Sequence, residues 1–192
     1  MRIPNSEFTK RPWRIHEFAS DFEVEDVWSL PTPGGPDDLG RFARGFTAPN
    51  TNEISDKATS VLFAIRWRLG KIFGWDDEDK GVKKRVVSLR DRLPEDLKNG
   101  DRGPDFSGVP FRSVYMTDTE WVSEIANKTV HALMHVGWVE DGKGGHHGVM
   151  TALVKPNGAF GKLYMVGIKP IRYTVVYPQL IRSIGKNWPQ YT

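Results

Sequence analysis

The sequence predicts an α+β fold in which a bent antiparallel sheet wraps around a long C-terminal α-helix. One observation is a helical face near the end of the chain, where large apolar residues recur at intervals of three and four. They are Tyr173, Tyr177, Leu180, Ile184 and Trp188. The other is a series of strand-length segments between residues 111 and 155, separated by turn residues. Because so long an apolar face must be buried, we expect the helix to pack on these strands.

The N-terminal part of the chain offers fewer regular elements. Residues 1–12 contain two prolines and mixed charges, and we expect them to lie along the surface as an arm. Between Ile15 and Trp28, apolar residues alternate imperfectly, which predicts one or two strands with a bulge or an edge position. The Pro/Gly-rich residues 31–36 form a loop. Asp37 and Asp38 are then expected to cap a short helix that runs to Phe46.

The middle of the chain contains the clearest helical pattern. Apolar residues from Ser55 to Phe73 keep the spacing of one helix face, and Gly74 is typical of a helix end. Residues 89–97 predict a short helix that is interrupted at Pro94. Residues 99–110 are rich in Gly, Pro and Asp and predict a loop.

From residue 111 the pattern changes to strands. The expected strands are 111–116, 120–126, 129–139 and 148–155, with a turn at 141–145 between the last two. Along the third strand, alternate residues face opposite sides of the sheet. One face is dry and is formed by Val130, Ala132, Met134, Val136 and Trp138. The other face is mixed and carries His131 and His135.

The C-terminal region is expected to begin with a short helix at 159–168, followed by a break and a longer helix from Pro170. Pro178 interrupts the longer helix because proline has no N–H to donate. The carbonyl of Thr174 therefore loses its usual partner. We expect a bend between Thr174 and Pro178.

Composition limits the classes of function. A chain of 192 residues without an evident linker predicts a single domain spanning residues 1–192. The net charge is +3 with scattered basic residues, and the one dense basic cluster, Lys83–Arg85, is too short to predict nucleic-acid binding. The absence of cysteine excludes disulfides and thiol catalysis, and fits a cytoplasmic protein. No segment is long and apolar enough to predict a membrane span.

The motifs that suggest specific chemistry are weak. His131 and His135 share a strand face but lie about 13 Å apart, too far to ligate one metal ion. His146 and His147 are neighbours on a strand and point to opposite faces. Residues 137–144 resemble a phosphate-binding loop, but a hairpin follows them instead of a helix. We therefore predict no metal and no cofactor.

Several segments of the chain resemble a bacterial family known as domain of unknown function 2867. The segments that carry the resemblance are 66–70, 74–76, 127–134, 151–154, 157–161, Tyr164 and 170–172. The likeness covers about Phe22 to Trp188. It implies a helix-grip fold similar to lipid-transfer (START) and plant-allergen (Bet v 1) proteins, with a cavity between sheet and helix. Where the family typically has Pro-Phe-His, this chain has Pro170-Ile171-Arg172.

These observations favour a protein that binds a small apolar or aromatic ligand, or a lipid, between the sheet and the terminal helix. The alternatives are a cyclase- or hydrolase-like enzyme that uses the same cavity, and a protein-interaction domain with a filled core. Tyr hydroxyls and the Arg172 guanidinium are the groups best suited to orient a ligand. The candidate ligand-binding residues are Trp121, His131, Met134, His135, Trp138, Tyr164, Arg172, Tyr173 and Tyr177. The sequence leaves the oligomeric state open.

Overall fold

The computed structural model describes residues 1–48, 86–107, 109–126, 130–157, 170 and 172–191. The helices predicted at 55–73 and 159–168 lie outside these residues, as do the basic cluster Lys83–Arg85 and Tyr164.

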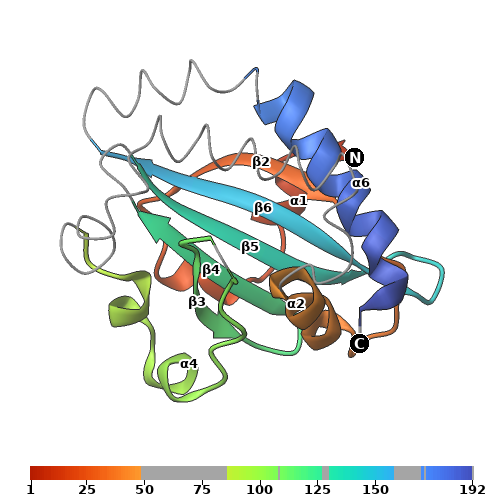
Figure 1. Cartoon of the computed structure of the whole chain (residues 1–192). Coiled ribbons are helices and arrows are strands. Elements are labelled where there is room, and N and C mark those ends of the chain that lie inside the picture. The colour runs from red at the N-terminus through yellow and green to blue at the C-terminus, as the bar shows by residue number, and fades with distance from the viewer. Residues whose placement is uncertain (49–85, 108, 127–129, 158–169, 171, 192) are drawn as a thin grey trace.

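Within the described residues, six strands form one antiparallel sheet in the order β1-β2-β6-β5-β4-β3 (Figure 1). The strands are β1 Arg2–Ile3, β2 Glu23–Ser29, β3 Arg112–Met116, β4 Glu120–Ala126, β5 Val130–Glu140 and β6 His146–Pro156. All four strands predicted after residue 110 are therefore confirmed. The predicted irregularity of β2 is a bulge between Val24 and Asp26, where its register with β6 shifts.

The described helices are short. They are α1 Ser6–Thr9, α2 Leu39–Thr47, α4 Glu95–Asn99 and α6 Tyr177–Asn187. Single 3₁₀ turns cover Arg14–Glu17, Leu89–Arg92 and Trp188–Gln190. The interruption predicted at Pro94 thus separates a 3₁₀ turn from α4. The helix predicted after Asp38 is α2, although the Asp38 carboxylate accepts from the Gly35 N–H (2.8 Å) instead of capping the helix.

Both faces of the sheet are covered. We call the side on which α2 and α6 lie the helix face (Figure 1). Its core residues are Trp28, Leu30, Leu39, Phe42, Ala43, Trp121, Val136, Trp138, Met150, Tyr177, Ile184 and Trp188. The predicted apolar face of the terminal helix therefore does pack on the sheet, with Tyr173 and Leu180 partly buried beside it.

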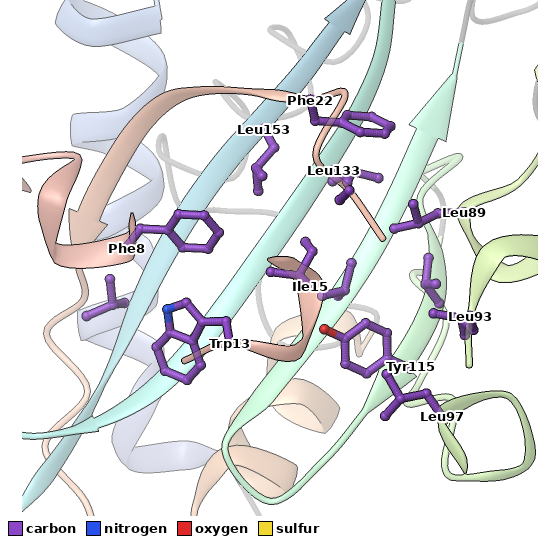
Figure 2. Close-up of a cluster of buried hydrophobic side chains, with 14 of the residues drawn as sticks. Phe8, Trp13, Ile15, Phe22, Leu89, Leu93, Leu97, Tyr115, Leu133 and Leu153 are labelled. Carbon is purple, nitrogen blue, oxygen red and sulfur yellow. The ribbon is translucent and has the colours of Figure 1, made fainter. Parts of the chain in front are cut away.

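The opposite side, which we call the N-terminal face, is covered by residues 8–22 and 89–97 (Figure 2). Phe8, Trp13 and Phe22 pack there against Leu133 and Leu153 of the central strands. The first 12 residues therefore differ from the expected surface arm. They form β1 and α1, and Phe8 is 1% exposed because its ring fills the core of this face.

The chain before α6 is irregular where Pro178 was predicted to interrupt the helix. Residues Arg172–Val176 form a π-helical turn, and α6 begins at Tyr177 with Pro178 in its first turn. The Thr174 hydroxyl donates to the Pro170 carbonyl (2.9 Å). A π-helical turn widens the helix locally and is one of the recognised sites of helix distortion.

Candidate functional site

One row of side chains crosses the helix face from β2 to β4. Asp26 in β2 pairs with Ala152 in β6, and Ala152 pairs with Met134 in β5. Met134 in turn pairs with Ser123 in β4. The two polar ends of the row are both 0% exposed, whereas Ala152 and Met134 are half-buried. The row thus places small or flexible apolar side chains between two buried polar groups.

The next row on the same face is built from much larger side chains. Trp28 pairs with Met150, Met150 with Val136, and Val136 with Trp121. All four are buried in the core that α2 and α6 cover. Ala152 and Ser123 have much smaller side chains than Met150 and Trp121, so the row of Asp26 carries less side-chain volume than its neighbour.

Asp26 is the centre of a buried polar group at the β2 end of this row. Its carboxylate accepts from the Trp28 indole N–H (2.9 Å) and from Arg172 Nη2 (3.0 Å). Arg172 Nη2 also donates to the Tyr177 hydroxyl. Burial raises the pKa of Asp26 although Arg172 lies beside it, and burial also raises the pKa of Tyr177. Burial opposes the charge of Arg172, but Tyr177 and Asp26 raise its pKa, so the guanidinium stays protonated.

Aromatic rings enclose this polar group. The rings of Trp28 and Tyr177 lie 4.7 Å apart, and those of Tyr173 and Tyr177 lie 6.3 Å apart and are stacked. The Arg2 guanidinium lies 4.5 Å above the ring of Tyr173. The group therefore combines one ion pair with flat apolar surfaces, as ligand sites commonly do.

The structure places six of the nine predicted site residues on the helix-face side of the sheet. They are Trp121, Met134, Trp138, Arg172, Tyr173 and Tyr177. Met134, Arg172, Tyr173 and Tyr177 belong to or lie near the row of Asp26. Trp138 lies further along the sheet, where its indole N–H donates to the Gly35 carbonyl (2.7 Å).

The two predicted histidines lie on the other side of the sheet. His131 and His135 are each 1% exposed on the N-terminal face. The ring of Phe22 lies 4.9 Å from that of His131, and the rings of Phe8 and Trp13 each lie 5.0 Å from that of His135. The sheet therefore separates both histidines from Arg172 and Tyr177, and they do not form one group with them.

Each histidine is paired with a buried glutamate of β4. His135 Nε2 lies 3.0 Å from Glu120 Oε2, and His131 Nε2 lies 2.9 Å from Glu124 Oε2. The other bonds of the glutamates reach the covering segments. Glu120 accepts from the Arg14 N–H (2.7 Å). Glu124 accepts from the Ser88 hydroxyl and from the Leu89 N–H (2.9 Å). The pairs thus fasten two 3₁₀ turns to the sheet.

These pairs predict that acid destabilises the fold. Burial lowers the pKa of His135 below 6.5 although Glu120 opposes the shift. The unfolded chain therefore takes up this proton first, and the free energy of unfolding decreases as the pH falls through 6.5. Burial raises the pKa of Glu120 and Glu124, but the hydrogen bonds from their histidine partners and from the covering segments outweigh it and hold both pKa values below 4.5. The stability that the two glutamates contribute is lost as the pH falls below 4.5. Asp26 has a raised pKa, so its protonation at low pH favours the folded state instead.

We expect His135→Gln to flatten the pH dependence of stability. The slope between about pH 7 and pH 5 should decrease by up to about 1.4 kcal/mol per pH unit, the value for one proton. Urea unfolding followed by tryptophan fluorescence at several pH values measures this slope. An unchanged slope in the variant would show that His135 is not the titrating group.

A family model with the description "Protein of unknown function (DUF2867)" matches residues 18–179. The chain belongs to the DUF2867 family. The resemblance seen in the sequence is thereby confirmed. The matched segment of this DUF2867 protein includes the whole row from Asp26 to Ser123, as well as Arg172 and Tyr177. No curated protein and no solved structure matches the chain.

Two further properties bear on the site of this DUF2867 chain. Over the residues that the structure describes, no three His, Asp or Glu side chains are grouped in a way that would hold a metal ion. In that same part of the chain, no helix has both the length and the apolar character needed to cross a membrane.

Sequence reasoning missed four polar residues of this DUF2867 protein: Asp26, Glu120, Ser123 and Glu124. A signal for the glutamates was present, because Glu120 and Glu124 have the same spacing as His131 and His135 on the neighbouring strand. Pairing the two strands as a hairpin places both glutamates on the same side of the sheet as the histidines. No sequence pattern indicated Asp26, because the bulge between Val24 and Asp26 changes the face of the sheet on which Asp26 lies.

Proposed function

We propose that this protein binds a small, largely apolar molecule between the helix face of the sheet and the C-terminal helix. The observation that carries the proposal is the row from Asp26 to Ser123, in which half-buried Ala152 and Met134 separate two buried polar ends. The small side chains of Ala152 and Ser123 favour a ligand here over the neighbouring row, which carries Trp28, Met150, Val136 and Trp121. Ligand sites are typically apolar cavities with a few oriented polar groups, and this row has that composition.

The proposal includes the helix-grip arrangement, in which the sheet bends around the terminal helix. A bent sheet and a straight helix touch along only part of their length. Here Tyr177, Ile184 and Trp188 are buried in the helix-face core, whereas Tyr173, in the π-helical turn that precedes α6, is only partly buried. This difference supports a ligand position near the N-terminal end of α6, above Met134 and Ala152.

Native mass spectrometry of protein purified from cells tests the proposal directly. A small molecule that is retained in stoichiometric amount supports it, and extraction with organic solvent then gives its exact mass. Protein that carries no small molecule, and that binds none from an extract of apolar metabolites, would contradict the proposal.

We expect Met134→Trp to fill the site and abolish retention of the molecule. The larger side chain should cost about 1–3 kcal/mol of stability through overpacking, because Met134 packs against the helix-face core. Met134→Leu is the matched control, since it keeps the volume and the apolar character. The Met134→Leu variant should retain the small molecule about as well as the parent protein does. A folded Met134→Trp variant that retains the molecule normally would exclude this site.

A further inference from the structure

The Ser123 hydroxyl has no hydrogen-bond partner among the described residues although Ser123 is 0% exposed. This is unusual, because buried hydroxyls nearly always find a partner and lose free energy without one. Ser113, which pairs with Ser123 from the edge strand, shows the ordinary situation. Its hydroxyl donates to the Pro104 carbonyl (2.5 Å) and accepts from the Trp121 indole N–H (3.0 Å).

The opposite end of the row also has unused hydrogen-bonding capacity. Both side-chain bonds that Arg172 forms within the described chain leave from Nη2, so Nε and Nη1 remain as donors. The side chain of Arg172 is 14% exposed, so it is not completely enclosed. Because Arg172 is bonded to Asp26, these N–H groups belong to the end of the row opposite Ser123.

The spacing of the two ends defines the length of the ligand. Asp26 and Ser123 lie on β2 and β4, three strand spacings apart through β6 and β5, or about 14 Å between Cα atoms. Ala152 and Met134 provide only apolar surface between them. A molecule that satisfies both ends must therefore be elongated, with an apolar middle and an oxygen at each end.

The charges of the site determine the charge of the ligand. Asp26 is 0% exposed and compensates the charge of Arg172 at 3.0 Å, so this end is neutral as a unit. A ligand carboxylate or ammonium would add an uncompensated charge to a buried region, which is strongly unfavourable. A neutral carbonyl or hydroxyl oxygen forms the same hydrogen bonds without this cost.

We infer that the ligand is an uncharged, elongated molecule with an oxygen at each end, one bonded to Ser123 and the other to Arg172. This inference rests on the proposed function and specifies its substrate class.

Three probes that share one apolar body test the inference. They are para,para′-biphenol, its isostere para,para′-dimethylbiphenyl, and biphenyl-para-carboxylate. Titration calorimetry should show that the biphenol binds at least about tenfold more tightly than either other probe, because only it bonds both ends without a charge. Equal or tighter binding of the dimethyl or carboxylate probe would overturn the inference while leaving ligand binding intact. If none of the probes binds, the inference is also wrong.

Two variants separate ligand binding from structure. Ser123→Ala removes the unpartnered hydroxyl, and Thr151→Val is its matched control. Thr151 is also 0% exposed with an unpartnered hydroxyl, but it lies on the N-terminal face. Neither variant should lower the thermal stability of the ligand-free protein, since neither breaks a hydrogen bond of the described chain.

Only Ser123→Ala should weaken biphenol binding, by about tenfold, while Thr151→Val leaves it unchanged. Binding of biphenol to Ser123→Ala with the parent affinity would overturn the role of Ser123. An equal loss of biphenol affinity in both variants would show a general effect on the sheet, and would also overturn the role of Ser123.

Discussion

Replacing Glu124 by alanine is expected to lower the free energy of unfolding by about 3–5 kcal/mol, because the variant loses a buried partner of three donors. Glu124 is 3% exposed and lies between the sheet and the segment that begins at Ser88. Without its carboxylate, His131 loses its partner at 2.9 Å. The Ser88 hydroxyl and the Leu89 N–H lose theirs at the start of the 3₁₀ turn Leu89–Arg92.

Urea unfolding at neutral pH measures the loss, and Glu17→Ala is the control. Glu17 is paired with Arg14 at 2.6 Å, but its side chain is 51% exposed. Exposed pairs of this kind contribute at most about 1 kcal/mol. If Glu124→Ala were no more destabilising than Glu17→Ala, the buried pair would not hold residues 88–92 on the sheet.

Replacing Asp26 by leucine is expected to lower the free energy of unfolding by about 3 kcal/mol in the ligand-free protein. The substitution leaves the mostly buried guanidinium of Arg172 without its counter-charge and the Trp28 indole N–H without its acceptor. The cost comes from the uncompensated charge, and so it should depend on Arg172.

A double-mutant cycle with Arg172→Met tests this dependence. Replacing both partners of a buried ion pair by apolar residues is often nearly neutral. The double variant Asp26→Leu, Arg172→Met should therefore be more stable than the sum of the single losses implies. Strictly additive losses would show that Asp26 and Arg172 do not act as a pair.

Much of the fold was predictable because the strands from residue 111 onward alternate in a simple way. The positions of β3 to β6 and the apolar face of α6 follow from local sequence patterns, and the structure confirms them. The first 12 residues were not predictable in the same way. Their burial depends on Phe8 finding a core that forms only when distant strands pair, and no local pattern indicates this.

The candidate site was predictable only in part, for a related reason. Arg172, Tyr177 and Met134 were identified because their residue types and their spacing on helix or strand suggest a lining. Their polar partner, Asp26, was not, because it comes from a strand at the other end of the chain. His131 and His135 were assigned to the same lining. The alternation along β5 places them on the opposite face of the sheet from Met134, so strand face is a better guide to this lining than residue type.

The order of the strands also governs how the chain folds. Strands β3 to β6 follow one another in sequence and pair with their neighbours, so each pairing closes only a short loop. Strand β2 instead pairs with β6, joining Trp28 to Met150 from opposite ends of the chain. Closing so long a loop is slow relative to local pairing. The lost chain entropy is offset only when β2 can pair with a β6 strand that has already formed. We therefore expect the β3–β6 meander to form early in folding, and the Asp26–Arg172 pair to form late.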